Sequence, residues 1–234
     1  MTGSSYSVFN AMTDIVASPG KALDEIKQHT AWMWWPLLVS MLLASGMMIY
    51  YFGWVDFGWL VDETIRQVPP ESRAESADAI RSFMSPATST WTTVAAIVVM
   101  SLIIYLITAT YLHLANKLGS GADIGFGQWF SLAIWSNFVG IFGVLASLIM
   151  IMMADSNQLS TQDLQVTSMN SLFFHAPAGE PWFTWASSLN LISFWTVFLT
   201  GTGIQRWTGA TMLKSMIIAA LPWVLIFGIW AAAI

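Results

Sequence analysis

Residues 91–114, WTTVAAIVVMSLIIYLITATYLHL, form an unbroken apolar stretch without Asp, Glu, Lys or Arg. A helix needs about twenty such residues to cross a hydrocarbon core of about 30 Å. None of four further apolar stretches contains Asp, Glu or Arg, and these are residues 32–54, 128–153, 183–204 and 213–233. The sequence therefore predicts an all-α, polytopic membrane helix bundle with five transmembrane helices.

The composition points the same way. Of the 234 residues 56% are hydrophobic and 9% are charged, whereas soluble domains carry about 25% charged residues. Many of the 14 tryptophans flank the apolar stretches, as in the aromatic belts of membrane proteins. We expect residues 1–30 to form a cytoplasmic amphipathic interfacial segment, followed by a transmembrane bundle over residues 31–234.

Several classes of function lack the residues that they need. The net charge of −5, with eight Lys and Arg, leaves no basic patch for nucleic acid. The absence of Cys excludes thiolate chemistry, and the spans lack the acidic and basic groups of proton-driven carriers and intramembrane enzymes. Methionines at the ends of the first and third spans are interpreted as apolar filler rather than a Cu(I) site. We predict a non-enzymatic protein with no catalytic residue, cofactor or metal site.

The distribution of Lys and Arg predicts the orientation, because cytoplasmic loops are enriched in both. With the N-terminus inside, the cytoplasmic segments hold Lys21, Lys27, Lys117, Arg206 and Lys214. The external helical loop 56–90 holds three arginines, and the external loop 154–182 has neither Lys nor Arg. We therefore expect a cytoplasmic N-terminus and a C-terminus outside.

The connecting segments predict short helices. One stripe of a helix over 6–17 would carry Val8, Phe9, Met12, Ile15 and Val16, which suits a helix lying among lipid headgroups. Ser18 and Pro19 then favour a second helix start, with Ala22, Leu23 and Ile26 on one face. The external loop predicts helices over 57–68 and 71–84, and the glycine-rich segment 116–127 predicts a tight turn.

Polar residues within or beside the spans are the candidate site positions. Asn137 and Asn190 fall in the third and fourth spans, and Thr108 and His113 in the second. Buried amides in hydrocarbon need partners, so they either make interhelical hydrogen bonds or line a cavity between spans two, three and four. Close helix packing is expected at the small-residue pairs Ser40/Ala44 and Ser136/Gly140. Candidate cytoplasmic headgroup contacts are Lys117, Arg206 and Lys214.

Two stretches carry a family resemblance. Residues 9–45, FNAMTDIVASPGKALDEIKQHTAWMWWPLLVSMLLAS, contain two short helices followed by Trp and Pro at the start of a span. Residues 113–145, HLANKLGSGADIGFGQWFSLAIWSNFVGIFGVL, contain a glycine turn before an aromatic-rich span. Both stretches resemble bacterial members of the Yip domain family, the Ypt/Rab-interacting proteins.

The resemblance implies a five-span, non-enzymatic membrane protein of the bacterial inner (plasma) membrane, with a cytoplasmic N-terminus and a periplasmic C-terminus. Eukaryotic members of that family act in vesicle traffic by binding small GTPases through a long cytoplasmic N-terminal region, and neither that region nor the family's Tyr-Gly span motifs are found here. We therefore expect a structural, interaction or membrane-organising role, with membrane lipids and a protein partner or a second copy of the chain as partners. The alternative is a small-solute or lipid permease that uses the cavity described above.

Overall fold

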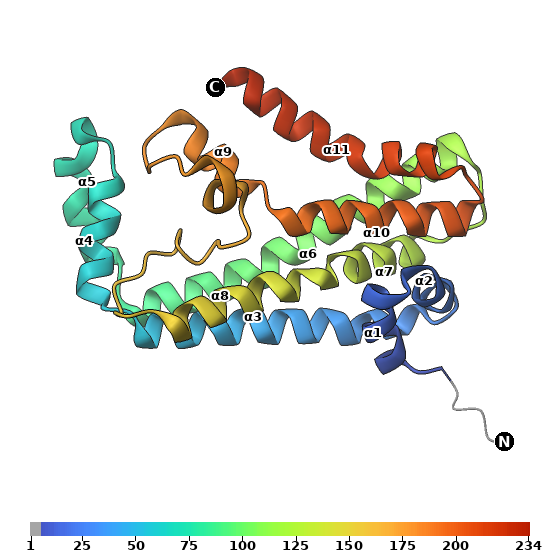
Figure 1. Ribbon diagram of the computed structural model, residues 1–234, viewed down its shortest axis with the longest axis horizontal. Coiled ribbons are helices and arrows are strands. Elements are labelled where there is room, and N and C mark those ends of the chain that lie inside the picture. The colour runs from blue at the N-terminus through green and yellow to red at the C-terminus, as the bar shows by residue number, and fades with distance from the viewer. Residues whose placement is uncertain (1–5) are drawn as a thin grey trace. The chain divides into compact units, whose positions relative to one another are not determined.

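A computed structural model describes residues 6–234, and the elements within that range are helical. They are α1 (Val8–Ala17), α2 (Pro19–Gln28), η1 (Thr30–Met33), α3 (Trp34–Trp54), α4 (Phe57–Gln67), α5 (Pro70–Phe83), α6 (Pro86–Gly119), α7 (Phe126–Asn137), η2 (Phe138–Gly140), α8 (Ile141–Met153), η3 (Asn170–Phe174), α9 (Pro181–Ser188), α10 (Leu191–Thr208) and α11 (Met212–Ala233). Figure 1 shows these helices in chain order. The predicted all-α class is confirmed.

Four helical stretches are long and apolar enough to cross a membrane: Thr30–Trp54, Pro86–Gly119, Phe126–Met153 and Met212–Ala233. They confirm four of the predicted spans. The stretch Phe126–Met153 combines α7, the 3-10 turn η2 and α8. With 34 residues, α6 is about 51 Å long, so its ends extend beyond a hydrocarbon core of about 30 Å.

The prediction of one continuous helix over 183–204 is wrong. The chain leaves the helix at Leu189 and Asn190, between α9 and α10. Asn190 accepts a hydrogen bond from the Ile192 amide through its side chain (2.8 Å), and so satisfies one of the free N–H groups at a helix start. The backbone of Leu189 and Leu191 also bonds to the segment Thr167–Met169, at 2.7 and 2.9 Å. The break leaves α10 with 18 residues, about 27 Å of helix.

The chain divides into two compact units. Unit 1 comprises Met1–Met41, Met100–Gly140 and Ser193–Ile226, and unit 2 comprises Leu42–Val99, Ile141–Ile192 and Phe227–Ile234. Helix α7 is the most buried element of unit 1, with Trp129 and all residues from Ser131 to Ser136 buried. Helix α10 lies close to it, because a Cβ added at Gly203 would be 2.4 Å from the Leu132 Cδ1 atom.

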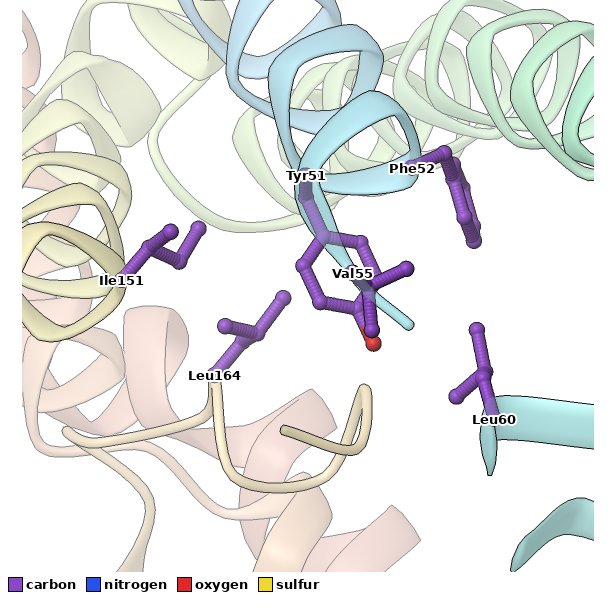
Figure 2. Close-up of a cluster of buried hydrophobic side chains, with 6 residues drawn as sticks. All are labelled: Tyr51, Phe52, Val55, Leu60, Ile151 and Leu164. Atoms are coloured by element: carbon purple, nitrogen blue, oxygen red, sulfur yellow. The ribbon is translucent and has the colours of Figure 1, made fainter. Parts of the chain in front are cut away.

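Unit 2 has its own apolar cluster, shown in Figure 2. Side chains from the end of α3, from α4, from α8 and from the loop 154–182 form it, namely Tyr51, Phe52, Val55, Leu60, Ile151 and Leu164. The Tyr51 hydroxyl donates a hydrogen bond to the Leu159 carbonyl (2.7 Å). The Ser147 hydroxyl donates one to the Leu164 carbonyl (2.5 Å). Met47 and Met48 pack against this cluster, as the filler interpretation predicted.

The short helices lie within one or two residues of the predicted ranges. Helices α4 and α5 confirm the two helices predicted over 57–68 and 71–84, and Figure 1 shows them next to one another. The Asp56 carboxylate caps α4 by accepting from the Trp59 amide (3.0 Å). Between α6 and α7, the Asn116 carbonyl accepts from the amides of Ser120 and Gly121 at 3.0 and 2.8 Å. Gly121 has a φ of 61°, a left-handed conformation that favours glycine.

Candidate functional site

The N-terminal helix pair is fixed to the end of α10, and this attachment is the most polar arrangement in unit 1. The Arg206 guanidinium forms a two-pronged ion pair with Asp24, with Nε 2.8 Å from Oδ1 and a second nitrogen on Oδ2. Next in sequence, the Trp207 indole N–H donates to the Leu23 carbonyl (2.9 Å). The Lys27 ammonium donates to the Trp207 carbonyl (3.1 Å). Bidentate Arg–carboxylate pairs hold a defined geometry, so α2 is attached at several points along its length.

A glycine in α2 permits the close approach of α2 to Arg206 of α10. A Cβ added at Gly20 would lie 2.9 Å from the Arg206 Nη1 atom. From the other side, the Gln128 amide of α7 donates to the Lys27 carbonyl (3.0 Å) and accepts from the Gly125 amide (2.9 Å). Helix α2 is therefore bonded to both α7 and α10.

The packing of α1 and α2 modifies the predicted interfacial stripe. Ala22, Leu23 and Ile26 are fully buried on one face of α2, as their spacing predicted. On α1, however, Ile15 is also fully buried, so this member of the predicted lipid-facing stripe packs inside the protein. Phe9 remains 63% exposed.

Exposed aromatic rings gather beside α1. The Phe9 ring lies 5.7 Å from that of Trp35, and Trp34 and Trp35 are about half exposed at the start of α3. Indole and phenyl rings at this level of a span are typical of the membrane–water interface. We call Phe9, Trp34 and Trp35 the aromatic rim.

The two asparagines have separate partners. Asn137 is half-buried at the end of α7, and its amide donates to the Ala133 carbonyl of the same helix (2.8 Å). Asn190 lies at the break before α10, and its amide donates to the Thr167 hydroxyl (2.8 Å). The first bond is therefore local, while the second connects α10 to the loop 154–182.

The other two candidate positions lie along α6. Thr108 and His113 are both half-buried. The His113 ring has an edge contact with Phe126 (6.1 Å between centroids), and its Nδ1 atom is buried without a hydrogen-bond partner. A cavity lined by these residues was one of the two alternatives in the sequence analysis. None of Thr108, His113, Asn137 and Asn190 lines the unit 1 pocket that we describe next.

A small pocket is lined by residues of α6, α7, α10 and α11 and of the turns beside them, all within unit 1. Its enclosed volume is about 20 Å³, enough for roughly one water molecule. We call it the Lys214 pocket, and its lining is Leu112, Ala115, Asn116, Gly119, Ser120, Trp129, Ile204, Thr208, Ala210, Lys214 and Ile218.

The three candidate headgroup contacts differ in their surroundings. Arg206 is engaged by Asp24, so its charge is already paired. Lys117 and Lys214 are exposed, and within residues 6–234 no ion pair to either ammonium is found. Of the three, Lys214 lines the pocket.

Sequence reasoning missed the polar atoms buried along α7. The indole nitrogens of Trp129 and Trp135 and the hydroxyls of Ser131 and Ser136 are buried without a hydrogen-bond partner. The interfacial-belt interpretation does not apply to two tryptophans of this helix, because Trp129 is 1% exposed and Trp135 fully buried. The sequence did offer a signal for these buried polar atoms, namely several serines and tryptophans within one span, because an apolar packing face does not require them.

Unit 2 holds a larger and more open cleft of about 430 Å³. Its lining includes Asp163, Asn170 and His175. The Asn170 side chain bonds both polar backbone atoms of Ala176, at 2.9 and 3.2 Å. This bonding holds the turn at His175, whose φ is 50°. Among residues 6–234, no group of three or more His, Cys, Asp and Glu gathers to hold a metal ion.

Comparison with known proteins gives one match. No curated protein and no solved structure is significantly similar to this chain. The family model described as the Yip1 domain matches residues 13–233, a range that contains α2, the turn between α6 and α7, and the apolar helices. The chain is therefore a multi-pass membrane protein that belongs to the Yip1 domain family.

Proposed function

We propose that this protein is a non-enzymatic organiser of the bacterial inner membrane, with its N-terminal helix pair held as a rigid platform on the cytoplasmic surface. The attachment of α2 to the ends of α7 and α10 is the observation that carries the proposal. An amphipathic helix that is merely adsorbed on lipid needs no ion pair to a transmembrane helix. Here Asp24, Leu23 and Lys27 all bond to the last residues of α10.

The aromatic rim gives the platform its contact with lipid. On α1, Ile15 faces the protein and Phe9 is exposed. One side of this helix therefore binds α2, and the neighbouring side presents an aromatic ring at the start of α3. Burial of apolar area determines how strongly such a helix binds the interface.

The charge distribution supports a cytoplasmic platform. All five Lys and Arg residues assigned to the cytoplasm belong to unit 1, and the three external arginines belong to unit 2. Protein partners or a second copy of the chain would bind the polar surface that the platform leaves exposed.

The Lys214 pocket supports headgroup contact better than passage of a solute. Small-molecule sites have volumes of about 300–1,000 Å³, and the enclosed volume between α6, α7, α10 and α11 is about 20 Å³. The cleft of about 430 Å³ in unit 2 is large enough for a small molecule, but its lining comes mainly from the loop 154–182 rather than from the spans. We therefore prefer the organising role to the permease.

Spin labels on the full chain in lipid nanodiscs test the platform, because the native chain has no Cys. A label at Phe9→Cys should be accessible to oxygen and shielded from a water-soluble nickel chelate. The control is Ala17→Cys, which is also exposed on α1 but lies about 80° around the helix, toward the polar side. It should show the opposite accessibility. Equal nickel accessibility at both positions would refute the interfacial platform.

A further inference from the structure

One residue that lines the Lys214 pocket carries a buried hydrogen-bond donor without a partner. Trp129 lines the pocket and is 1% exposed, and its indole nitrogen has no acceptor. A donor left unsatisfied inside a protein is costly, so such atoms are rare unless water or a ligand completes them. An indole N–H can only donate, so whatever completes it must supply an acceptor.

The other polar side chains of the pocket already make hydrogen bonds within the protein. The Asn116 amide donates to the Ala122 carbonyl (2.8 Å), and its oxygen accepts from the Ser120 hydroxyl (2.5 Å). The Thr208 hydroxyl donates to the Ile204 carbonyl (2.7 Å). These bonds fix the walls and leave the Trp129 N–H and the Lys214 ammonium as the unpaired donors of the pocket.

The charge of the pocket is positive. Lys214 carries the single formal charge in the lining, which includes no Asp or Glu. Its Nζ atom lies 4.0 Å from where a Cβ of Gly119 would be, so the ammonium reaches across to the end of α6. Lys214 also belongs to the first turn of α11, where the helix dipole favours an anion.

We propose that the Lys214 pocket binds a phosphate group, with one phosphate oxygen accepting from Trp129 Nε1 and a second oxygen contacting the Lys214 ammonium. The enclosed volume of about 20 Å³ accommodates one oxygen atom, and the rest of the phosphate stays in the open mouth of the pocket. A phospholipid headgroup and free inorganic phosphate share this chemistry. The headgroup source rests on the proposed membrane-organising function, but the phosphate site itself does not.

The test uses the purified full chain and a matched pair of lysine variants. Lys214→Met removes the pocket's charge, whereas Lys117→Met removes an equal charge at the end of α6, outside the pocket lining. Native mass spectrometry measures binding of short-chain phosphatidylglycerol in detergent and, separately, of inorganic phosphate. A charge-assisted hydrogen bond corresponds to about tenfold or more in affinity. Lys214→Met should weaken binding by this factor, and Lys117→Met by less than about threefold.

A second measurement reports on Trp129 directly. In protein labelled with ¹⁵N at the indole nitrogens, the Trp129 resonance is the one that Trp129→Phe removes. Addition of the phosphate-bearing ligand should move this resonance downfield, as expected when an N–H gains an acceptor. If Trp129→Phe does not fold, the lysine pair still decides the question.

The outcomes separate the two sources and the alternatives. Lipid binding that excess inorganic phosphate does not displace supports the headgroup. Binding of inorganic phosphate alone supports a soluble phosphate, and in that case the site survives without a lipid role. Equal loss in both lysine variants would show diffuse charge attraction and overturn the site. An indole resonance unmoved by either ligand would show that the pocket holds water only, and would also overturn it.

Discussion

Replacing Gly203 by alanine tests the closest helix contact in unit 1. A Cβ at this position would lie 2.4 and 2.9 Å from the two Cδ atoms of Leu132 and 3.2 Å from its Cγ. Leu132 is fully buried in α7, so its side chain cannot swing aside into open space. The substitution must therefore separate α10 from α7 or force Leu132 out of its rotamer.

The expected cost follows from two opposing terms. Overpacking a buried contact costs about 1–3 kcal/mol, while alanine in place of glycine favours a helix by about 1 kcal/mol. We expect Gly203→Ala to lower the free energy of unfolding by up to about 2 kcal/mol. At Gly201 the nearest atoms belong to the flexible end of Met216, so Gly201→Ala should cost less.

Two further variants make the measurement specific. Gly228→Ala has no atom within 4 Å of its Cβ and should be neutral or slightly stabilising. Leu132→Ala alone should cost about 2–5 kcal/mol, but combined with Gly203→Ala it removes the clash. The double variant should be about 1–3 kcal/mol more stable than the sum of the single variants. Unfolding in mixed micelles by titration with dodecyl sulfate, followed by circular dichroism, measures each value. Strictly additive losses would refute the contact.

Three further predictions concern topology, polar contacts and pH. A cysteine at the exposed Ser156 should react with a membrane-impermeant thiol reagent from outside intact cells, and a cysteine at Ser120 should not; the reverse pattern would invert the proposed orientation. Asn190→Leu removes the bonds to Thr167 and Ile192 and should cost about 1–2 kcal/mol in the micelle titration, whereas Asn137→Leu removes a bond within one helix and should cost about 0.6 kcal/mol or less; equal costs would contradict this assignment. The pKa of Asp14 is held below its usual range by the Lys21 ammonium, and then by the Tyr6 hydroxyl, so the stabilisation of α1 is complete above about pH 3.9 and is lost as the pH falls through the lowered pKa. Amide hydrogen exchange in α1 should therefore speed up in acid, after correction for the intrinsic rate, and Asp14→Asn should show that faster exchange at neutral pH; an unchanged neutral-pH rate in Asp14→Asn would count against the ion pair.

The spans that could be predicted are those in which hydrophobicity alone determines the structure. Residues 91–114 contain no charged residue and no Pro, Gly or Asn, and the structure places them inside one helix. The stretch 183–204 is likewise uncharged but more polar, Asn190 caps a new helix within it, and the neighbouring backbone bonds to Thr167 and Met169. That backbone pairing depends on a loop distant in sequence. A hydropathy profile averages over neighbouring residues and therefore does not predict it.

The close helix contacts were predicted at the wrong glycines. The spacing of Ser136 and Gly140 suggested close approach, but a Cβ at Gly140 would meet no atom within 4 Å. The tight contacts occur at Gly201 and Gly203, flanked by Thr200 and Thr202. A two-residue spacing does not match the four-residue rule for helix faces, so these glycines contact different neighbours, Met216 and Leu132. Only the packing directions in three dimensions reveal this.

A ring contact between two tryptophans connects the platform with the Lys214 pocket, and we expect this contact to couple them. Trp129 lines the pocket, and its ring lies 5.7 Å from that of Trp207. Trp207 in turn donates to Leu23 and accepts from Lys27. We therefore expect that a phosphate bound beside Trp129 favours the state in which Trp207 contacts α2. A ligand at one hundred times its Kd stabilises the state that binds it by about 2.7 kcal/mol, so occupancy of the pocket would hold the platform closed against the bundle. Lys214→Met should accordingly raise the exposure of α2 in lipid without touching any α2 contact.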